Sequence, residues 1–439
     1  MSEKDVDVVI VGAGTAGLAA LRDLDRGGKR VLCLEARSRI GGRIRTIHDR
    51  MSPIPIELGA EFVHGKPPEI LKIAESAPLT LYDCTERAMH IRDGKPVKNK
   101  DAWLQVDQVM EGLKAAVKKG RDETFSEFLE QSSYSKDAKE LATSYVEGFN
   151  AARAELISIA SLVQDAEAAD EIDGDKSFRL MNGYEAIPRW LTQGMDDLGT
   201  KLKLNCAVQA IRWKRGTATV EFLSRDSSNV QTITAKQAVI TVPLGVLQAA
   251  PGLLGAIEFD PEPTDILAAA RQLCFGHVVR LILRFRQVVW EEKGEFANVG
   301  FLLSTEKHFP TWWTPLPVRA RSITGWSAGP HADELLGLGK SEIVLRALHD
   351  LSRILSTSAK KLSEQLESSY FHDWHGDPFA RGAYSYVPAH AMNARGKLAR
   401  AVDGTLYFAG EATEINGHSA TVHGAIASGC RAARQILND

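Results

Sequence analysis

The stretch "VVIVGAGTAGLAA", residues 8–20, decides the fold of the first part of the chain. An apolar run enters a glycine-rich turn, and the pattern from Thr15 to about Arg26 is that of a helix. A second apolar run, "RVLCLE", then closes on Glu35. Two apolar strands around one helix predict a βαβ unit with a parallel sheet.

The glycines in this turn have the G-x-G-x-x-G spacing, with a strand before them and a helix after them. Gly12 permits the tight turn, Gly14 lets the backbone approach a pyrophosphate, and Gly17 lets the helix pack closely on the sheet. Glu35, at the end of the second strand, is placed to accept hydrogen bonds from ribose hydroxyls, and its charge would repel a 2′-phosphate. The motif therefore predicts a Rossmann-like domain that binds NAD or FAD and disfavours an NADP-type ligand.

Composition limits the other possibilities. The 439 residues favour two domains. The 53 basic and 56 acidic residues give a net charge of −3, which provides no reason to expect nucleic acid or an anionic membrane as partner. No apolar window reaches about 18 residues, and the N-terminus lacks an export signal. The five cysteines are scattered, so we expect a cytoplasmic, thiol-reduced protein without a metal site.

Further along the chain, the pattern changes from helical to strand-like and back. Residues 66–195 are predicted to form a helical layer, and strand-like text returns at 205–222, 236–247 and 277–290. A strand at 404–410 and a helix beginning near Thr421 end the chain. We predict an α/β and α+β protein in which residues 1–69, 196–255 and 375–439 form a discontinuous cofactor domain. Residues 70–195 and 256–374 would form a substrate-binding domain of mixed sheet and helices.

Five separated blocks distinguish between the two dinucleotides. They are "EARSRIGGRIRT" (35–46), "IELGAEFVHG" (56–65), "AVITVPLGVL" (238–247), "WHGDPFARGAYSYVP" (374–388) and "LYFAGEATEINGHSATVHGAIASGCRAA" (406–433). Together and in this order they resemble the flavin amine oxidase family, which includes monoamine oxidases, polyamine oxidases and lysine demethylases. The resemblance implies that the first domain binds FAD.

The resemblance also implies which residues hold the flavin. Glu411 would lie near its ribityl and phosphate groups, Val208 would offer backbone contacts to the adenine, and the helix opened by Thr421 and Val422 would face the pyrimidine edge. Negative charge develops at this edge on reduction, and a helix N-terminus stabilises it. The full expected set is Gly12, Gly14, Gly17, Glu35, Ala36, Arg37, Gly42, Arg43, Gly59, Ala60, Glu61, Phe62, Val208, Trp374, Gly410, Glu411, Thr421 and Val422.

Two positions bear on the attachment of the flavin and on the amine site. Monoamine oxidases carry a flavin-tethering cysteine where this chain has Ala383, so we expect a non-covalent flavin. Tyr384 matches one member of the aromatic pair that flanks the substrate amine in the family, and its partner aligns with Thr421. Trp374 would supply an aromatic wall nearby, and such electron-rich faces hold cations loosely.

Arg280 is the sharpest departure from the family, whose members usually carry a lysine here that holds a water on flavin N5. Arginine offers a charged planar fork on a longer arm, so the exchange is not conservative. Four roles stay open: Arg280 reaches N5 directly, carries the water in another pose, binds a substrate carboxylate, or turns aside to pair with an acid.

The incoming amine is protonated, and two residues near the channel could accept its proton. His64 occupies a place where polyamine oxidases carry a histidine or an acid, and an imidazole there could take this proton. Glu61 is the other candidate, although the resemblance favours a flavin-side role for it. The run "QDAEAADEIDGD", residues 164–175, has six acids and no base, and it either steers polycations or is simply solvated.

Together these features predict an FAD-dependent amine oxidase, with Arg280, Tyr384 and His64 as catalytic residues. A hydride would pass from the carbon beside the nitrogen of a monoamine or polyamine to flavin N5, the imine would hydrolyse to an aldehyde or ketone, and dioxygen would become hydrogen peroxide. The alternatives are an L-amino-acid oxidase, a flavoenzyme of the desaturase or protoporphyrinogen-oxidase type, and a flavin-bound interaction module. The expected oligomeric state is a monomer or a homodimer.

Overall fold

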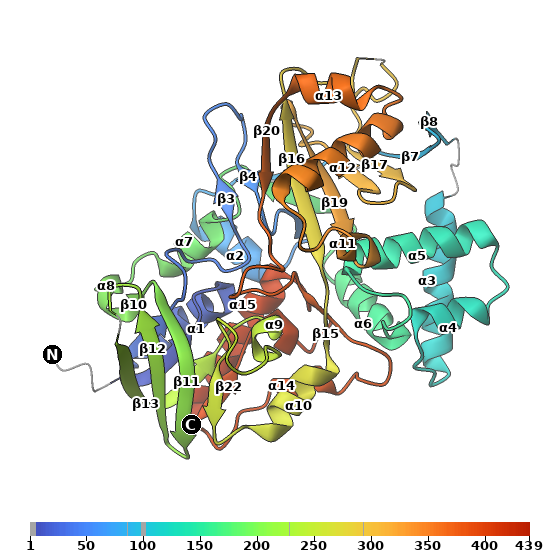
Figure 1. Cartoon of the computed structure of the whole chain (residues 1–439). Helices are drawn as coiled ribbons and strands as arrows, with labels where there is room; N and C mark the ends of the chain where they lie inside the picture. Colours follow the sequence, from blue (N-terminus) through green and yellow to red (C-terminus); the bar gives the residue numbers. More distant parts are fainter. Residues whose placement is uncertain (1–5, 86, 98–101, 228, 293) are drawn as a thin grey trace.

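A computed structural model describes residues 6–85, 87–97, 102–227, 229–292 and 294–439. Figure 1 shows two sheets, one at the lower left of the view and one at the top, with a layer of helices at the right. None of the helices in this described part combines the length and the apolar composition that crossing a bilayer requires.

The first sheet contains the predicted βαβ unit. Its strands follow the order β10 (Leu202–Lys203), β2 (Val31–Leu34), β1 (Val6–Val11), β13 (Val230–Ile240), β12 (Thr217–Ser224), β11 (Cys206–Lys214) and β14 (Glu258–Asp260), and β22 (Leu406–Phe408) pairs with the end of β13. The strands β10, β2, β1, β13 and β22 run parallel, whereas β12 is antiparallel to both of its neighbours. The parallel pairing of β1 with β2 confirms the prediction made from residues 8–35.

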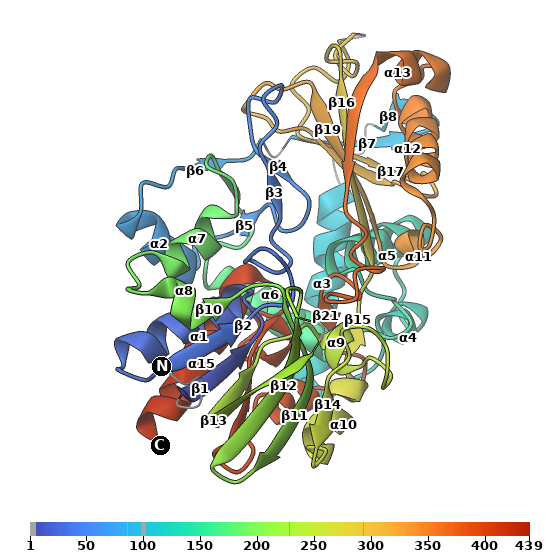
Figure 2. The ribbon, with the colours of Figure 1, turned by 60° about the vertical axis from the view of Figure 1, so that its left-hand side comes forward.

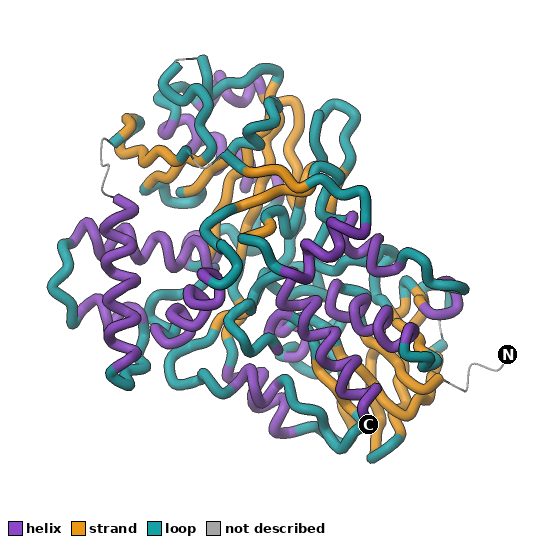
Figure 3. The backbone as a smooth tube through the Cα atoms, turned by 180° about the vertical axis from the view of Figure 1, so that it is seen from behind, coloured by secondary structure: helices purple, strands orange, loops and turns teal. Residues whose placement is uncertain are grey.

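Both faces of this sheet are covered, which explains why β1 is apolar at almost every position. Val8 and Ile10 pack with α1 (Thr15–Arg26) and α15 (Val422–Asn438), while Val9 and Val11 pack on the other side with residues of β11, β12 and α10 (Thr264–Gln272). Figure 3 shows the helical face from behind. The two helices approach closely at Gly429. A Cβ at this position would lie only 2.1 Å from the carbonyl oxygen of Ala16, so only glycine permits this approach.

The second sheet has the order β20 (Leu366–Phe371), β16 (Val278–Phe285), β19 (Ser322–Ala328), β18 (Thr311–Trp313), β17 (Phe301–Ser304), β7 (Ala88–Arg92) and β8 (Lys95–Pro96). Every residue of β16 is buried. Figure 2 shows α12 (Lys340–Ile354) and α13 (Ala359–Gln365) beside this sheet. Side chains of α12 form one apolar core with those of β16 and β19.

The helical layer consists of α3 (Ala102–Lys118), α4 (Phe125–Glu130), α5 (Lys136–Asn150) and α6 (Ile159–Asp170). The last three of these helices are capped by side-chain oxygens, those of Thr124, Ser135 and Ser158. Each oxygen accepts a hydrogen bond from a backbone amide that has no partner within the first turn of its helix.

The prediction of a helical layer at 66–195 is wrong in part, because this segment also holds β6 (Leu81–Asp83), β7, β8 and β9 (Ser177–Leu180). These strands have two to five residues, too few for alternation to show in the sequence. Within it α2 (Pro68–Ser76) and α7 (Ala186–Thr192) share a core with α1. The boundaries of the two domains stay a prediction.

The remaining elements are short. They are β3 (Thr46–Ile47), β4 (Ile56–Glu57), β5 (Val63–His64), α8 (Leu198–Lys201), α9 (Leu244–Leu247), β15 (Cys274–Phe275), α11 (Pro330–Asp333), β21 (Ser385–Tyr386), α14 (Ala394–Leu398) and a 3-10 turn at Glu411–Thr413.

Candidate active site

A cavity of about 1170 Å³ is lined by residues of both sheets and of the helical layer. Of the residues predicted from the sequence to form the site, all except Gly17 line this cavity. They are Gly12, Gly14, Glu35, Ala36, Arg37, Gly42, Arg43, Gly59, Ala60, Glu61, Phe62, His64, Val208, Arg280, Trp374, Tyr384, Gly410, Glu411, Thr421 and Val422. The fold therefore brings together segments that are up to 410 residues apart (422 minus 12).

The glycine turn between β1 and α1 has three different steric environments. Gly12 adopts a φ of +102°, and a Cβ on Gly17 would lie 1.9 Å from the carbonyl oxygen of Gly12. A Cβ on Gly14, by contrast, would meet no protein atom within 4 Å. Gly12 and Gly17 are thus required by the fold itself, whereas Gly14 leaves open space at the cavity wall.

Backbone amides without acceptors surround this open space. In the described part of the chain, the amides of Thr15, Ala16, Gly42 and Arg43 have no acceptor. Arg39, which sequence reasoning missed, donates to the carbonyl oxygens of Gly42 and Ile44, both at 2.9 Å, and so holds the second glycine turn in place. Convergent free amides at a helix N-terminus suit the phosphates of a dinucleotide.

Glu35 is fixed at the end of β2 by two backbone amides. Its Oε2 accepts from the amide of Ala13 at 2.7 Å and its Oε1 from that of Arg37 at 2.9 Å. Burial raises the pKa of this carboxyl, and the two hydrogen bonds oppose that effect. Each carboxylate oxygen keeps a further lone pair that can accept from a ribose hydroxyl. Val208 lies on β11, two residues after Cys206, whose backbone amide donates to the carbonyl oxygen of Glu35 at 2.8 Å.

Arg37 and its neighbours form a polar network that the sequence did not reveal. The guanidinium of Arg37 donates to Asp377 at 2.8 Å, and Asp377 also contacts Nε2 of His372 at 2.9 Å. These contacts bring the pKa of Asp377 far below its usual range although burial acts in the opposite direction. Arg37 is therefore held in place before any ligand arrives.

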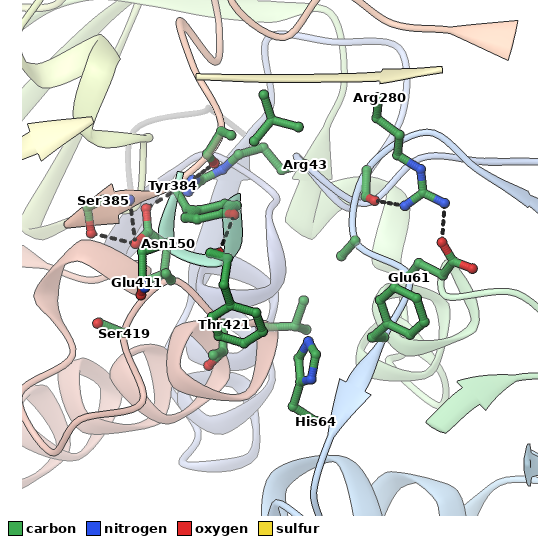
Figure 4. Close-up of a pocket in the computed structure, with 18 of the residues that line it drawn as sticks. Arg43, Glu61, His64, Asn150, Arg280, Tyr384, Ser385, Glu411, Ser419 and Thr421 are labelled. Carbon is green, nitrogen blue, oxygen red and sulfur yellow. Dashed lines mark hydrogen bonds and ion pairs between the residues drawn. The ribbon is translucent and has the colours of Figure 1, made fainter. Parts of the chain in front are cut away.

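A second ion pair lies where the two C-terminal sequence blocks meet the block at residues 35–46. Arg43 donates to Glu411 at 2.9 Å and to the carbonyl oxygen of Ala383 at 2.5 Å, while the hydroxyl of Ser385 donates to Glu411 at 2.7 Å. Figure 4 shows this group on one side of the cavity, across from Arg280 and Glu61. The network ties three of the five sequence blocks together.

The N-terminus of α15 opens on the cavity. The side chain of Thr421 caps the helix by accepting from the amide of Gly424 at 2.9 Å, and the amides of Val422 and His423 have no acceptor among the described residues. The His423 side chain is buried, its Nε2 has no partner, and burial lowers its pKa to about 3. Unsatisfied donors at this position suit a ligand with acceptor atoms, as the pyrimidine edge of a flavin has.

Arg280, on β16, is paired with an acid. It donates to the carbonyl oxygen of Gly59 at 2.7 Å and to the carboxylate of Glu61. Figure 4 shows its guanidinium facing Glu61. Of the four roles considered for Arg280, this geometry matches the one in which it turns aside to pair with a carboxylate.

Glu61 accepts from two further donors that no pattern in the sequence indicates. Nε of Arg179, on β9, lies 2.5 Å from Oε1, and the indole N–H of Trp313 lies 3.0 Å from Oε2. Burial acts to raise the pKa of Glu61, but the charges of Arg280 and Arg179 bring it below its ordinary value. Glu61 is therefore an ionised, fully engaged carboxylate rather than an available base.

His64, Tyr384 and Trp374 surround the inner part of the cavity. His64 lies 3.4 Å from the hydroxyl of Ser177, and burial lowers its pKa to about 4, so its imidazole is neutral at neutral pH. The Tyr384 hydroxyl donates to the carbonyl oxygen of Phe149 at 2.8 Å, and burial raises its pKa. The indole of Trp374 donates to the carbonyl oxygen of Leu58 at 2.7 Å.

Two of the six acids in the run 164–175, Asp165 and Asp175, line the cavity. Burial raises the pKa of Asp165 to about 6. Asp173, in contrast, pairs with Lys66 at 2.8 Å away from the cavity lining. Only part of the run is thus placed where it can act on a bound ligand.

Comparison with known proteins identifies the family of the chain. A family model described as flavin containing amine oxidoreductase matches residues 15–437. Lysine-specific histone demethylase 1 homolog 2 of Oryza sativa subsp. japonica is 28% identical over 452 residues, which cover 98% of this chain and 57% of the relative. The chain thus spans little more than half the length of that relative.

Two other relatives are matched over most of their length. Polyamine oxidase 4 of Oryza sativa subsp. japonica is 28% identical over 97% of this chain and 87% of its own. Human amine oxidase [flavin-containing] B is 26% identical over 100% of this chain and 87% of its own.

A solved structure of putrescine oxidase bound to putrescine superposes with a TM-score of 0.80 at 20% identity, over 99% of both chains. This likeness concerns the fold, and it confirms the predicted class with its Rossmann-like domain. The family match covers nearly the whole chain, from the start of α1 to the last helix. The chain belongs to the flavin-containing amine oxidoreductase family.

Proposed function

We propose that this chain is an FAD-dependent oxidase that acts on the C–N bond of a small amine, with dioxygen as second substrate and with FAD bound non-covalently. The observation that carries the proposal is the single cavity at which the predicted flavin-side residues meet His64, Tyr384 and Arg280. Residues that only stabilise the fold need not line the same cavity, so their meeting there supports a shared function.

The residues present fit FAD. The free amides at the start of α1 and in the second glycine turn would hold the pyrophosphate, Glu35 would hold a ribose, and the start of α15 would face the ring. When bound, FAD would supply hydride acceptance from the carbon beside nitrogen and electron transfer to dioxygen, which yields an imine, then an aldehyde or ketone, and hydrogen peroxide.

The side chains around the inner cavity would prepare the amine. An ammonium has a pKa near 10 in water, so it must lose a proton before its carbon can be oxidised. His64 is neutral and lines the cavity, so one of its nitrogens can accept that proton; because burial disfavours the charged imidazole, His64 would pass the proton on to solvent. Glu61 already accepts from three donors, and we therefore assign the proton to His64 and a positioning role to Glu61.

Non-covalent binding is supported by the position of Ala383 at the cavity wall. Its carbonyl oxygen accepts from Arg43, and its methyl group offers no nucleophile. Cys206 is the one cysteine among the described lining residues, and it lies on β11 close to Val208, at the end expected for adenine.

The amino-acid oxidase alternative is weakened by the pairing of Arg280. A substrate carboxylate would have to displace Glu61 or the carbonyl oxygen of Gly59, and Arg179 would still hold Glu61 in place. Family membership favours amine oxidation over the desaturase or protoporphyrinogen-oxidase type and over an interaction module. A cytoplasmic location and a monomeric or homodimeric state stay predictions.

The test uses the purified yellow protein. Acid precipitation should release the flavin into the supernatant, and colour that stays with the polypeptide would contradict non-covalent binding. Anaerobic mixing with monoamines and polyamines should bleach the flavin, and air should then produce peroxide. Bleaching only by amino acids or only by a porphyrinogen would replace the proposal with the corresponding alternative, and bleaching by none of these compounds would favour the interaction module.

A further inference from the structure

The cavity continues outward from the inner site along an unbroken series of ring contacts. Successive centroid distances are 5.4 Å for Trp313 to Phe62, 5.9 Å for Phe62 to His64, 5.5 Å for His64 to Phe149, 5.7 Å for Phe149 to Tyr145, 6.0 Å for Tyr145 to Trp103 and 6.1 Å for Trp103 to His90. All of these residues line the cavity. The wall is therefore aromatic from the Arg280 pair to the helical layer.

The outer rings are not covered by the protein. Trp103 is 47% exposed and Phe149 is 54% exposed, although both line the cavity. Tyr145 and Phe149 are four residues apart on α5, so they share one face of that helix. Exposed aromatic faces inside a cavity suit either an apolar chain or a cation, because the face of an aromatic ring is electron-rich.

The charges in the cavity distinguish these two ligands. Arg37, Arg43 and Arg280 are each paired with a carboxylate. Asp107 and Asp137 line the cavity and have no ion-pair or hydrogen-bond partner among the described residues. Across the same described lining, Arg92 is the one arginine without a carboxylate partner. The unpaired charge is thus negative on balance, which favours a cation over a neutral chain.

Asp107 lies next to the aromatic rings. It follows Trp103 by four residues on α3, so the two side chains leave the same side of that helix. Trp103 meets Tyr145 of α5 edge to face, with 6.0 Å between the ring centroids, so Asp107 lies on the face of α3 that meets Tyr145. Burial and then the charge of Asp107 raise the pKa of Tyr145. A carboxylate beside two aromatic faces is an arrangement that holds an ammonium.

We propose that Trp103, Tyr145 and Asp107 form a second cation subsite at the outer end of the cavity. Resting on the proposed function, this subsite would hold the far ammonium of a diamine or polyamine while Phe149 flanks its alkyl chain. The near amine would then reach His64 and Tyr384. Preferred substrates would therefore carry two positive charges joined by a flexible chain.

The test measures binding apart from turnover. Calorimetry on the purified flavoprotein would compare a straight alkane with a trimethylammonium group at both ends against one of equal length with a single such group. We expect the doubly charged probe to bind about tenfold more tightly, and Asp107→Asn or Trp103→Leu to remove this preference. Asp226→Asn, an exposed acid outside the cavity lining, serves as the matched control and should keep it.

Equal affinity for the two probes, or an unchanged preference in both Asp107→Asn and Trp103→Leu, would overturn the subsite. A second arm compares kcat/KM for a diaminoalkane and a monoaminoalkane of equal length. Oxidation of both without preference would contradict the subsite and leave the proposed function standing. Selective binding of the doubly charged probe without oxidation of any amine would contradict the proposed function and leave the subsite standing.

Discussion

The guanidinium of Arg280 is paired with the carboxylate of Glu61, and both side chains are almost fully buried, with exposed fractions of 5% and 10%. Arg179 reaches the same carboxylate at 2.5 Å and is also 5% exposed. One negative charge thus lies between two buried positive charges at the cavity wall. Such a cluster is stable only while every member has its partner.

Replacing Glu61 should therefore destabilise the protein. In Glu61→Gln the two guanidinium groups face each other without a counter-charge, and we expect the free energy of unfolding to fall by about 3–5 kcal/mol. Urea unfolding measured without added flavin tests this. Glu342→Gln, which removes an exposed helical pair with Arg346, should change stability by about 0.5 kcal/mol or less. Equal midpoints for the two variants would contradict a structural role for Glu61.

Replacing Arg280 should act on turnover before it acts on flavin binding. In Arg280→Ala, Glu61 keeps Arg179 as partner, so the loop that carries Gly59 stays largely in place. We expect the variant to retain its flavin. Flavin reduction or reoxidation should slow on the order of tenfold or more, because a tenfold slower rate corresponds to an activation free energy higher by about 1.4 kcal/mol. Stopped-flow absorbance measures both half-reactions. Traces identical to those of the wild-type protein would exclude a role for Arg280 in catalysis.

The sequence predicted those parts of the site whose signals are local. The glycine spacing, the apolar run before it and the acid at the end of β2 occupy residues 8–35, and the structure shows the expected strand, turn, helix and strand. The start of the last helix near Thr421 is also confirmed, and the structure adds that the Thr421 side chain caps it.

The sequence could not predict contacts between short segments that are far apart. Arg179 lies in a four-residue strand, 118 positions from Glu61, and Asp377 lies 340 positions from Arg37. No periodicity connects such residues, and only the closed fold brings them together. The role of Arg280 stays open in the sequence for the same reason, since which of the four roles it has depends on where Glu61 lies.

His64 should determine how amine oxidation depends on pH. Its pKa is lowered to about 4, so above pH 5 it stays neutral and has a nitrogen lone pair free to relay a proton to solvent, although burial makes it a weak base. At pH 7 the amine arrives protonated, and His64→Gln should reduce the rate of anaerobic flavin reduction on the order of a hundredfold. Near pH 10 much of the amine is already neutral, so the difference should shrink. A loss of equal size at both pH values would indicate that His64 does not accept the proton.

His423 should contribute to acid sensitivity of the fold. Burial lowers the pKa of His423 from its ordinary value of 6.5 to about 3 in the folded protein. Between pH 3 and pH 6.5 the unfolded chain therefore binds a proton at this residue that the folded protein does not. Stability is therefore lost as pH falls through this window, by up to about 1.4 kcal/mol per pH unit. In His423→Gln the free energy of unfolding should fall less steeply between pH 6.5 and pH 4. Parallel curves for wild type and variant, measured by urea unfolding of the flavin-free protein, would contradict this assignment.

Gly14 and Gly17 should separate flavin binding from folding. The Gly14 backbone, with φ of −71° and ψ of 177°, accepts any residue, and an added Cβ meets no protein atom within 4 Å but projects at the edge of the cavity. Gly14→Ala should therefore leave the flavin-free protein within about 0.5 kcal/mol of wild type and weaken FAD binding about tenfold or more. In Gly17→Ala the new Cβ would lie 1.9 Å from the carbonyl oxygen of Gly12, so α1 must move away from the turn. That variant should lose about 1–3 kcal/mol of stability even without flavin. Flavin titration and urea unfolding of both variants provide the comparison, and unchanged FAD affinity in Gly14→Ala would show that the pyrophosphate does not lie against this turn.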